Sequence, residues 1–211
     1  MILDPGSSLL DTLYWVTLLA VFVSSSSGVL KAGLNKFDLF GVIIIATTTG
    51  LGGGSMRDLL LGRDVFWITD QTFFIASLSS ALLIFVLARF IAFSTKYMLV
   101  ADAGGLATFG IAGTLVALIL GAPYLIASFM GVITGIMGGI FRDILCKESP
   151  VVFSSPLYAT VLWLGSLLFI ALLHFECNVN LAAFVSGVSI FVSRLLALYF
   201  GISLPKFRFK C

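Results

Sequence analysis

Charged residues are scarce in this sequence. Only 10% of its 211 residues are Asp, Glu, Lys or Arg, whereas a soluble domain carries about 25%. Hydrophobic residues make up 60% of the chain, and the mean hydropathy is +1.16. Because too few polar side chains remain to cover a water-facing surface, the composition predicts an integral membrane protein.

Residues that carry chemistry are scarce as well. One histidine and three widely separated cysteines provide no CxxC pair and no metal-ligand spacing. No nucleophile is paired with a base and no cofactor fingerprint is present, so we expect no enzyme, no catalytic residue, no metal and no cofactor. The net charge of +2 comes from basic residues spread along the chain rather than from one patch, so no nucleic-acid partner is expected.

Long uncharged stretches are abundant. A helix needs about 20 mostly apolar residues to cross the hydrocarbon layer. Asp4 and Asp11 stand where a cleaved signal peptide has positive charge, so we expect the first stretch to be retained. The seven windows are residues 13–30, 39–61, 72–87, 97–120, 123–145, 156–173 and 181–198. The connections between them are short, so no soluble domain is expected.

Lysine and arginine divide unequally between the two faces that seven spans create. Only Arg57 and Arg63 fall on one face. The other face, which holds the C-terminus, receives Lys31, Lys36, Arg89, Lys96, Arg142, Lys147, Arg194, Lys206, Arg208 and Lys210. Basic residues concentrate on the cytoplasmic side of membranes. We therefore expect the C-terminus in the cytoplasm and the N-terminus outside.

A twelve-residue motif recurs after 85 positions. TGLGGGSMRDLL begins at Thr49 and TGIMGGIFRDIL begins at Thr134, with seven identical positions. The match predicts a three-helix unit in residues 1–93, a second in residues 94–176, and a seventh helix with a basic tail in residues 177–211. Because an odd number of spans reverses direction across the membrane, the repeats are expected to be inverted. The predicted fold is an all-α membrane protein of seven transmembrane helices.

Glycines in each copy lie on one helical face, at i, i+3 and i+4, with an arginine at i+7. The run from Gly52 to Gly54 predicts a bend or a short unwinding. Freed carbonyls, with hydroxyls from Thr49, Ser55 and Thr134, could replace part of a monovalent cation's hydration shell. The alternative is that small residues only let helices pack closely.

Arginine and aspartate follow the glycines in each copy. Ionisable residues within spans usually face a bundle interior or a water pathway, although interfacial anchoring is the alternative. Adjacent residues on a helix point in different directions, so each is expected to pair with another helix, as a gate or latch. Asp102 lies inside the fourth span and needs a partner or water. The candidate ion pathway comprises Thr49, Gly50, Gly52, Gly53, Gly54, Ser55, Arg57, Asp58, Asp102, Thr134, Gly135, Gly138, Gly139, Arg142 and Asp143.

Four stretches carry a family resemblance: residues 50–63 (GLGGGSMRDLLLGR), 102–110 (DAGGLATFG), 131–145 (GVITGIMGGIFRDIL) and 157–160 (LYAT). The chain resembles the prokaryotic trimeric intracellular cation channel family, which overlaps bacterial membrane proteins with a glycine-transporter domain. The resemblance implies a homotrimer with one potassium-conducting pore per protomer, and kinked second and fifth helices. The second copy has Met137 where the first copy has Gly52, the first of its three consecutive glycines. Val65 stands where relatives often have proline.

Three functions remain open from the sequence. The first is a passive channel for potassium, sodium or other monovalent cations, in a prokaryotic inner membrane and in contact with its lipid. The second is a carrier of glycine or another small solute that uses the same repeats. The third is a structural membrane subunit.

Overall fold

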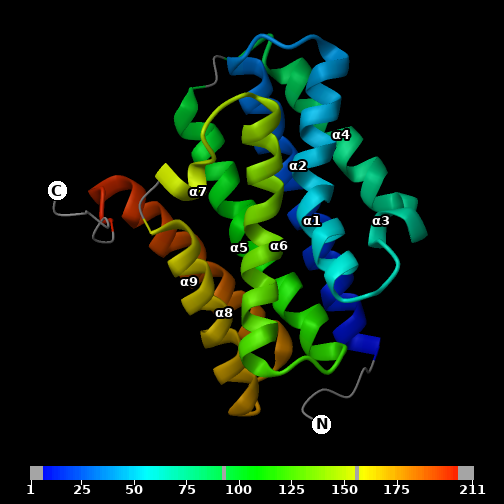
Figure 1. The fold of residues 1–211 in the computed structure, drawn as a ribbon, viewed down its shortest axis with the longest axis vertical. Helices are drawn as coiled ribbons and strands as arrows, with labels where there is room; N and C mark the ends of the chain where they lie inside the picture. The colour runs from blue at the N-terminus through cyan, green and yellow to red at the C-terminus, as the bar shows by residue number, and fades with distance from the viewer. Residues whose placement is uncertain (1–6, 92–93, 155–156, 204–211) are drawn as a thin grey trace, which may run out of the picture.

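The structure is a computed structural model that describes residues 7–91, 94–154 and 157–203 (Figure 1). Its described part is entirely helical. The helices are α1 (Ser7–Leu34), α2 (Leu39–Leu60), α3 (Phe66–Thr69), α4 (Gln71–Leu87), α5 (Thr95–Ile119), α6 (Tyr124–Leu145), α7 (Val151–Ser154), α8 (Tyr158–His174) and α9 (Val179–Phe200). The all-α expectation is confirmed for this part of the chain. Asp4, Pro156, the basic tail with Lys206, Arg208 and Lys210, and Cys211 lie outside the described residues.

Five helices are long and apolar enough to cross a membrane. These helices are α1, α2, α5, α6 and α9. The other two predicted windows correspond to α4 and α8, which have 17 residues each. At 1.5 Å per residue they are about 26 Å long, at the lower end of what a bilayer requires. The structure thus supports an integral membrane protein with five clear spans and two shorter apolar helices.

The helix boundaries repeat along the chain. The helices α2 and α6 begin and end 85 positions apart, and so do the short helices α3 and α7. The sequence had predicted only loops at α3 and α7, because four residues are too few to show a helical period. One asymmetry is the start of the long helices: Asp38 accepts a hydrogen bond from the Gly41 backbone N–H at 2.8 Å, whereas α6 starts after Pro123. Proline is suited to that place because its missing N–H would have no helical partner.

The long helices α1 and α5 lie side by side at the centre of the bundle. The helix α5 contacts α1, α6, α8 and α9, and α2 contacts α1, α4 and α6. Leucine, isoleucine and phenylalanine side chains, among them Leu106, Leu115, Phe169 and Ile190, join α5, α8 and α9. Figure 1 shows α2 running down the view and α6 running up it, with α8 and α9 together on one side. This arrangement brings both copies of the glycine motif to one helix crossing.

Candidate functional site

The crossing of α2 and α6 is a direct backbone contact. A Cβ added to Gly53 would collide with the carbonyl oxygen of Thr134, and one added to Gly138 would collide with that of Thr49. The same Cβ positions lie 3.4 Å from the Gly138 nitrogen and 3.8 Å from the Gly53 nitrogen, respectively. These reciprocal contacts fix the two helices as antiparallel. The glycine faces therefore meet each other, and no bare groove remains between them at this point.

The expected unwinding at the glycine run is not present in the structure. Both α2 and α6 are continuous helices through the motif. The Thr49 hydroxyl donates to the Ile45 carbonyl at 2.6 Å, and the Thr134 hydroxyl donates to the Met130 carbonyl at the same distance. Ser55 donates to the Leu51 carbonyl at 2.8 Å. The prediction of freed carbonyls was wrong, because tight antiparallel packing stabilises the helical backbone despite the glycines.

The remaining motif glycines of α2 accommodate side chains from other helices. A Cβ on Gly50 would meet the Ser25 side chain and the Val21 carbonyl of α1. A Cβ on Gly52 would lie 2.7 Å from the Phe141 ring, and one on Gly54 would lie 2.5 Å from the Phe66 ring. Close packing explains these three positions. It also explains why the first copy keeps glycine where the second has methionine, since Phe141 needs the space beside Gly52.

In α6, Gly135 and Gly139 have different surroundings. A Cβ on Gly135 would lie 2.7 Å from the Leu162 side chain. A Cβ on Gly139 would have only ordinary contacts, at 3.5 Å from the Tyr158 hydroxyl, 3.6 Å from Arg142 Nη2 and 3.7 Å from Asp102 Oδ1. Gly139 therefore borders a group of polar side chains and tolerates a small substituent.

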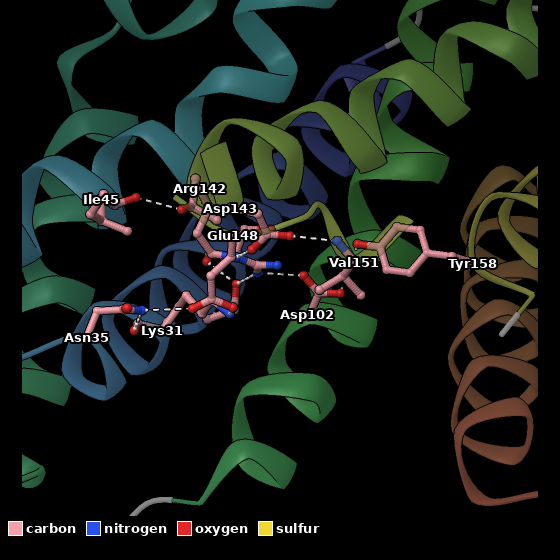
Figure 2. A network of polar contacts seen from close by, with 12 residues as sticks. Lys31, Asn35, Ile45, Asp102, Arg142, Asp143, Glu148, Val151 and Tyr158 are labelled. Carbon is pink, nitrogen blue, oxygen red and sulfur yellow. Dashed lines mark hydrogen bonds and ion pairs between the residues drawn. The ribbon is translucent and has the colours of Figure 1, made fainter. Parts of the chain in front are cut away.

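That polar group is a buried network around Arg142 (Figure 2). Arg142 Nη1 donates to Asp102 Oδ1 of α5 at 2.7 Å and to Ser27 Oγ of α1 at 3.0 Å, and Nε donates to Asp143 Oδ1 at 2.9 Å. The Tyr158 hydroxyl of α8 donates to Asp102 Oδ2 at 2.8 Å. Both partners of the Arg142–Asp102 ion pair are almost fully buried. The expectation that Asp102 needs a partner is confirmed.

The arginine of the first copy has fewer acceptors. Arg57 Nε donates to Asp58 Oδ1 at 2.8 Å, and the guanidinium carbon lies 5.5 Å from the centre of the Phe66 ring. Arg63 Nε lies 3.6 Å from the same Asp58 oxygen. Among the residues that the structure describes, Arg57 Nη1 is buried without a hydrogen-bond partner, and so is Arg142 Nη2, but Arg142 has two carboxylates beside it and Arg57 has Asp58. The two copies of the motif thus differ in how completely their arginine is neutralised.

Each aspartate of the motif performs the same local task. Asp58 Oδ2 accepts a hydrogen bond from the Phe66 backbone N–H at 2.9 Å, and Asp143 Oδ2 accepts one from Val151 at 2.8 Å. Phe66 and Val151 are the first residues of α3 and α7, where backbone N–H groups lack helical partners. The expectation that each of these residues pairs with another helix is confirmed for Asp58, Arg142 and Asp143, and the arginine and aspartate of each copy also bond to each other. The flexible arginine side chain spans the roughly 100° between neighbouring positions.

Several site residues were not among the sequence candidates. Ser27 and Tyr158 complete the Arg142 network, and the buried Arg194 of α9 lies 4.5 Å from the centre of the Tyr158 ring. The position of Ser27 at the end of a four-serine run and the occurrence of Tyr158 in the LYAT stretch were the available signals. A cation over an aromatic face cannot be recognised from spacing, so Arg194 had no such signal.

Lys31, near the end of α1, is buried and paired with an acidic side chain. It is 8% exposed and forms an ion pair with Glu148, which also accepts a hydrogen bond from Asn35 at 3.1 Å (Figure 2). The hydrogen bonds from Lys31 and Asn35 hold the pKa of the Glu148 carboxyl below its usual value. This contact ties the end of α1 to the loop after α6, close to Asp143.

Comparison with known proteins identifies the family. The family model described as glycine transporter matches this chain twice, over residues 14–89 and 99–174. The chain belongs to the TRIC-like glycine-transporter family. It is 36% identical to the UPF0126 inner membrane protein YadS of Escherichia coli over 92% of this chain and 95% of YadS. A UPF0126 membrane protein of Vibrio cholerae is 40% identical over 94% of this chain and 84% of the relative.

Comparison with solved structures indicates the same family. The TRIC trimeric intracellular cation channel orthologue from Rhodobacter sphaeroides has a TM-score of 0.86 and 34% identity, covering 90% of this chain and 99% of that one. A chain from a study of conductance through TRIC cation channels has a TM-score of 0.81 and 28% identity, covering 93% and 97%. This TRIC-like chain is therefore an integral membrane protein with the TRIC channel fold.

Proposed function

We propose that this protein is a passive channel for monovalent cations, potassium among them, that works as a homotrimer with one pore in each protomer. Its similarity to the trimeric intracellular cation channel orthologue supports this proposal, because the two chains match over nearly their whole lengths. The inner-membrane relative in Escherichia coli supports a place in a prokaryotic inner membrane. Lipid surrounds the apolar outer faces of the helices.

The architecture proposed for the pore is two inverted three-helix units and a seventh helix. Residues 1–93 contain α1, α2 and α4, residues 94–176 contain α5, α6 and α8, and residues 177–211 contain α9. The constant offset of 85 residues, the antiparallel α2 and α6, and the double match of the family model all support it. The N-terminus then lies outside and the C-terminus in the cytoplasm, as the basic residues indicate.

The observation that carries the proposal is the contact of Gly53 and Gly138 with the opposite helix backbone. Because backbone atoms fill this point, ions pass only when α2 and α6 separate there, and the crossing works as the gate. Separation costs no large side-chain rearrangement, since the glycines carry no side chains. The proposed pathway comprises Thr49, Gly50, Gly52, Gly53, Gly54, Ser55, Arg57, Asp58, Asp102, Thr134, Gly135, Gly138, Gly139, Arg142 and Asp143.

The charges along this path suit cations. Asp143 and Asp102 both contact the Arg142 guanidinium, so the arginine does not present an uncompensated positive charge. Asp58 is similarly placed beside Arg57. An unpaired arginine in a narrow low-dielectric path would repel potassium strongly. The two aspartates beside Arg142 therefore make cation passage compatible with this arginine, and Asp58 partly compensates the charge of Arg57.

Currents in planar lipid bilayers test this function. Purified protein should give unitary potassium currents that persist in symmetrical chloride-free salt, because the permeant ion is the cation. Absence of unitary currents, together with saturable uptake of labelled glycine into liposomes, would contradict the channel. For substitutions at Gly53 or Gly138, Gly187→Ala is a suitable control variant, since no described atom lies within 4 Å of a Cβ at that position of α9.

A glycine or small-solute carrier is the second candidate. The observation that favours it is the family model, which is described as glycine transporter. Such a carrier would use the same two units in alternating access, with a site near the membrane midplane. The bilayer experiment distinguishes the two candidates, because a carrier gives no unitary steps.

A further inference from the structure

A cavity of about 190 Å³ lies beside Arg57, which stands in the last turn of α2. Figure 1 shows that α2 and α6 end at opposite ends of the bundle. Thr17, Tyr14 and Phe73 contribute to the cavity wall, and Arg63 and Asp70 lie at its more exposed edge. The volume corresponds to about six water molecules. Arg57 is 1% exposed, and among the described residues its Nη1 has no hydrogen-bond partner, as is also true of Arg142 Nη2. A buried cationic donor is therefore left over next to this cavity.

The second unit shows what this arginine position accommodates. Shifted by 85 residues, Arg57 corresponds to Arg142, and Thr17 corresponds to Asp102. Arg142 receives a carboxylate from Asp102 at 2.7 Å, but Thr17 supplies no carboxylate to Arg57. Position 73 is likewise phenylalanine where the second unit has Tyr158, so the hydroxyl that holds Asp102 is missing as well. The first unit therefore has the arginine and a cavity, without the carboxylate.

The aspartate beside Arg57 does not make up this deficit. Asp58 Oδ1 is shared between Arg57 Nε at 2.8 Å and Arg63 Nε at 3.6 Å. Its Oδ2 accepts the Phe66 N–H at 2.9 Å. A buried charged donor that lacks an acceptor destabilises the folded protein. A ligand that supplies an acceptor to Nη1 relieves this cost.

We propose that the cavity beside Arg57 binds a small carboxylate, which occupies the place that Asp102 occupies beside Arg142. Arginine presents planar paired donors that match a carboxylate. Arg63 adds a second cation at the open edge, where it steers anions inward. The cavity takes the carboxylate of either a simple organic acid or a free amino acid. Asp70 lies at the rim, where its carboxylate can contact the ammonium group of an amino acid.

This site goes beyond the proposed channel and does not depend on it, because binding is measured without ion flow. The probes are sodium acetate and L-alanine, whose methyl groups are followed by saturation-transfer-difference NMR with the full chain in lipid nanodiscs. Thr17→Asp supplies an internal carboxylate and should abolish binding of both probes. Arg63→Gln changes an exposed side chain and should weaken binding by about tenfold, equal to about 1.4 kcal/mol. Arg89→Gln, two residues beyond the end of α4, should leave binding unchanged.

Each outcome decides the proposal. Saturable acetate binding that is lost in Thr17→Asp and weakened in Arg63→Gln supports it, and stronger binding of L-alanine identifies an amino acid as the source. Stronger binding of acetate than of L-alanine identifies a simple organic acid as the source of the carboxylate. Equal acetate signals in wild type and a folded Thr17→Asp overturn it, as do competition by chloride at equal concentration and the absence of any binding. Should Thr17→Asp not fold, an unchanged affinity of Arg63→Gln is sufficient to overturn it.

Discussion

The Tyr158 hydroxyl donates a 2.8 Å hydrogen bond to Asp102 Oδ2, so α8 holds the carboxylate that neutralises Arg142 on α6. Arg194 of α9 lies over the same tyrosine ring. The helix α9 is thereby connected to the charge network around Arg142.

Removing that hydroxyl should weaken the bundle without breaking the ion pair. We expect Tyr158→Phe to lower the free energy of unfolding by about 1–2 kcal/mol, because a buried hydrogen bond to a charged acceptor is lost. Denaturation of the purified protein in detergent measures the change. Tyr199→Phe, on an exposed tyrosine of α9, is the control and should have no effect. Equal stability of Tyr158→Phe and wild type would show that Asp102 is held by Arg142 alone.

The α2–α6 contact makes two alanine substitutions equivalent. Gly53→Ala and Gly138→Ala should each destabilise the protein by about 1–3 kcal/mol, since the new methyl group meets a carbonyl oxygen of the opposite backbone. Thermal unfolding midpoints provide the measurement. Gly187→Ala should be neutral or stabilising, because it relieves the helix-propensity cost of glycine in open space. A large effect at only one of the paired positions would be inconsistent with the reciprocal contact.

Acid should weaken the contact between Lys31 and Glu148. The folded-state pKa of Glu148 is lowered by its hydrogen bonds, so the contact contributes stability above the ordinary glutamate pKa of about 4.3 and loses it as pH falls through the folded pKa. Glu148→Gln should therefore flatten the acid side of a plot of unfolding temperature against pH. The effect at neutral pH should be below about 1 kcal/mol, because Glu148 is exposed. Glu176→Gln, at an exposed position after α8, should show the same decrease of unfolding temperature at low pH as the wild type.

The orientation in the membrane can be tested with accessibility tags. Tags at the C-terminus and in residues 92–96 should be reached only from the cytoplasm, and a tag in residues 65–71 only from outside. The expectation follows from the basic residues gathered on one face. Tags in residues 65–71 and at the C-terminus that report the same side would contradict both the inversion and the seven-span topology.

The helical segments and the duplicated motif could be predicted because they depend on patterns within the sequence. The match of six of the ten residues from Thr49 to Asp58 with those 85 positions later anticipated two helices with the same boundaries. Asp102 was recognised because a lone carboxylate among apolar residues needs a partner, whichever helix supplies it.

Other features depend on which side chain reaches which neighbour. The glycine run at residues 52–54 is compatible with either unwinding or close packing, and only the position of the Thr134 carbonyl distinguishes them. The bond between Arg57 and Asp58 depends on a rotamer that spacing does not specify. The absence of a second carboxylate beside Arg57 became visible only when its surroundings were compared with those of Arg142.

Cysteine modification at Gly139 tests most directly the claim that cations pass beside the Arg142 network. In a background with Cys146, Cys177 and Cys211 changed to serine, Gly139→Cys introduces a thiol where a Cβ has only ordinary contacts. A cationic methanethiosulfonate reagent applied to active channels should abolish the potassium current of Gly139→Cys and leave that of Gly187→Cys unchanged. Full potassium current after complete modification of Gly139→Cys would contradict the account.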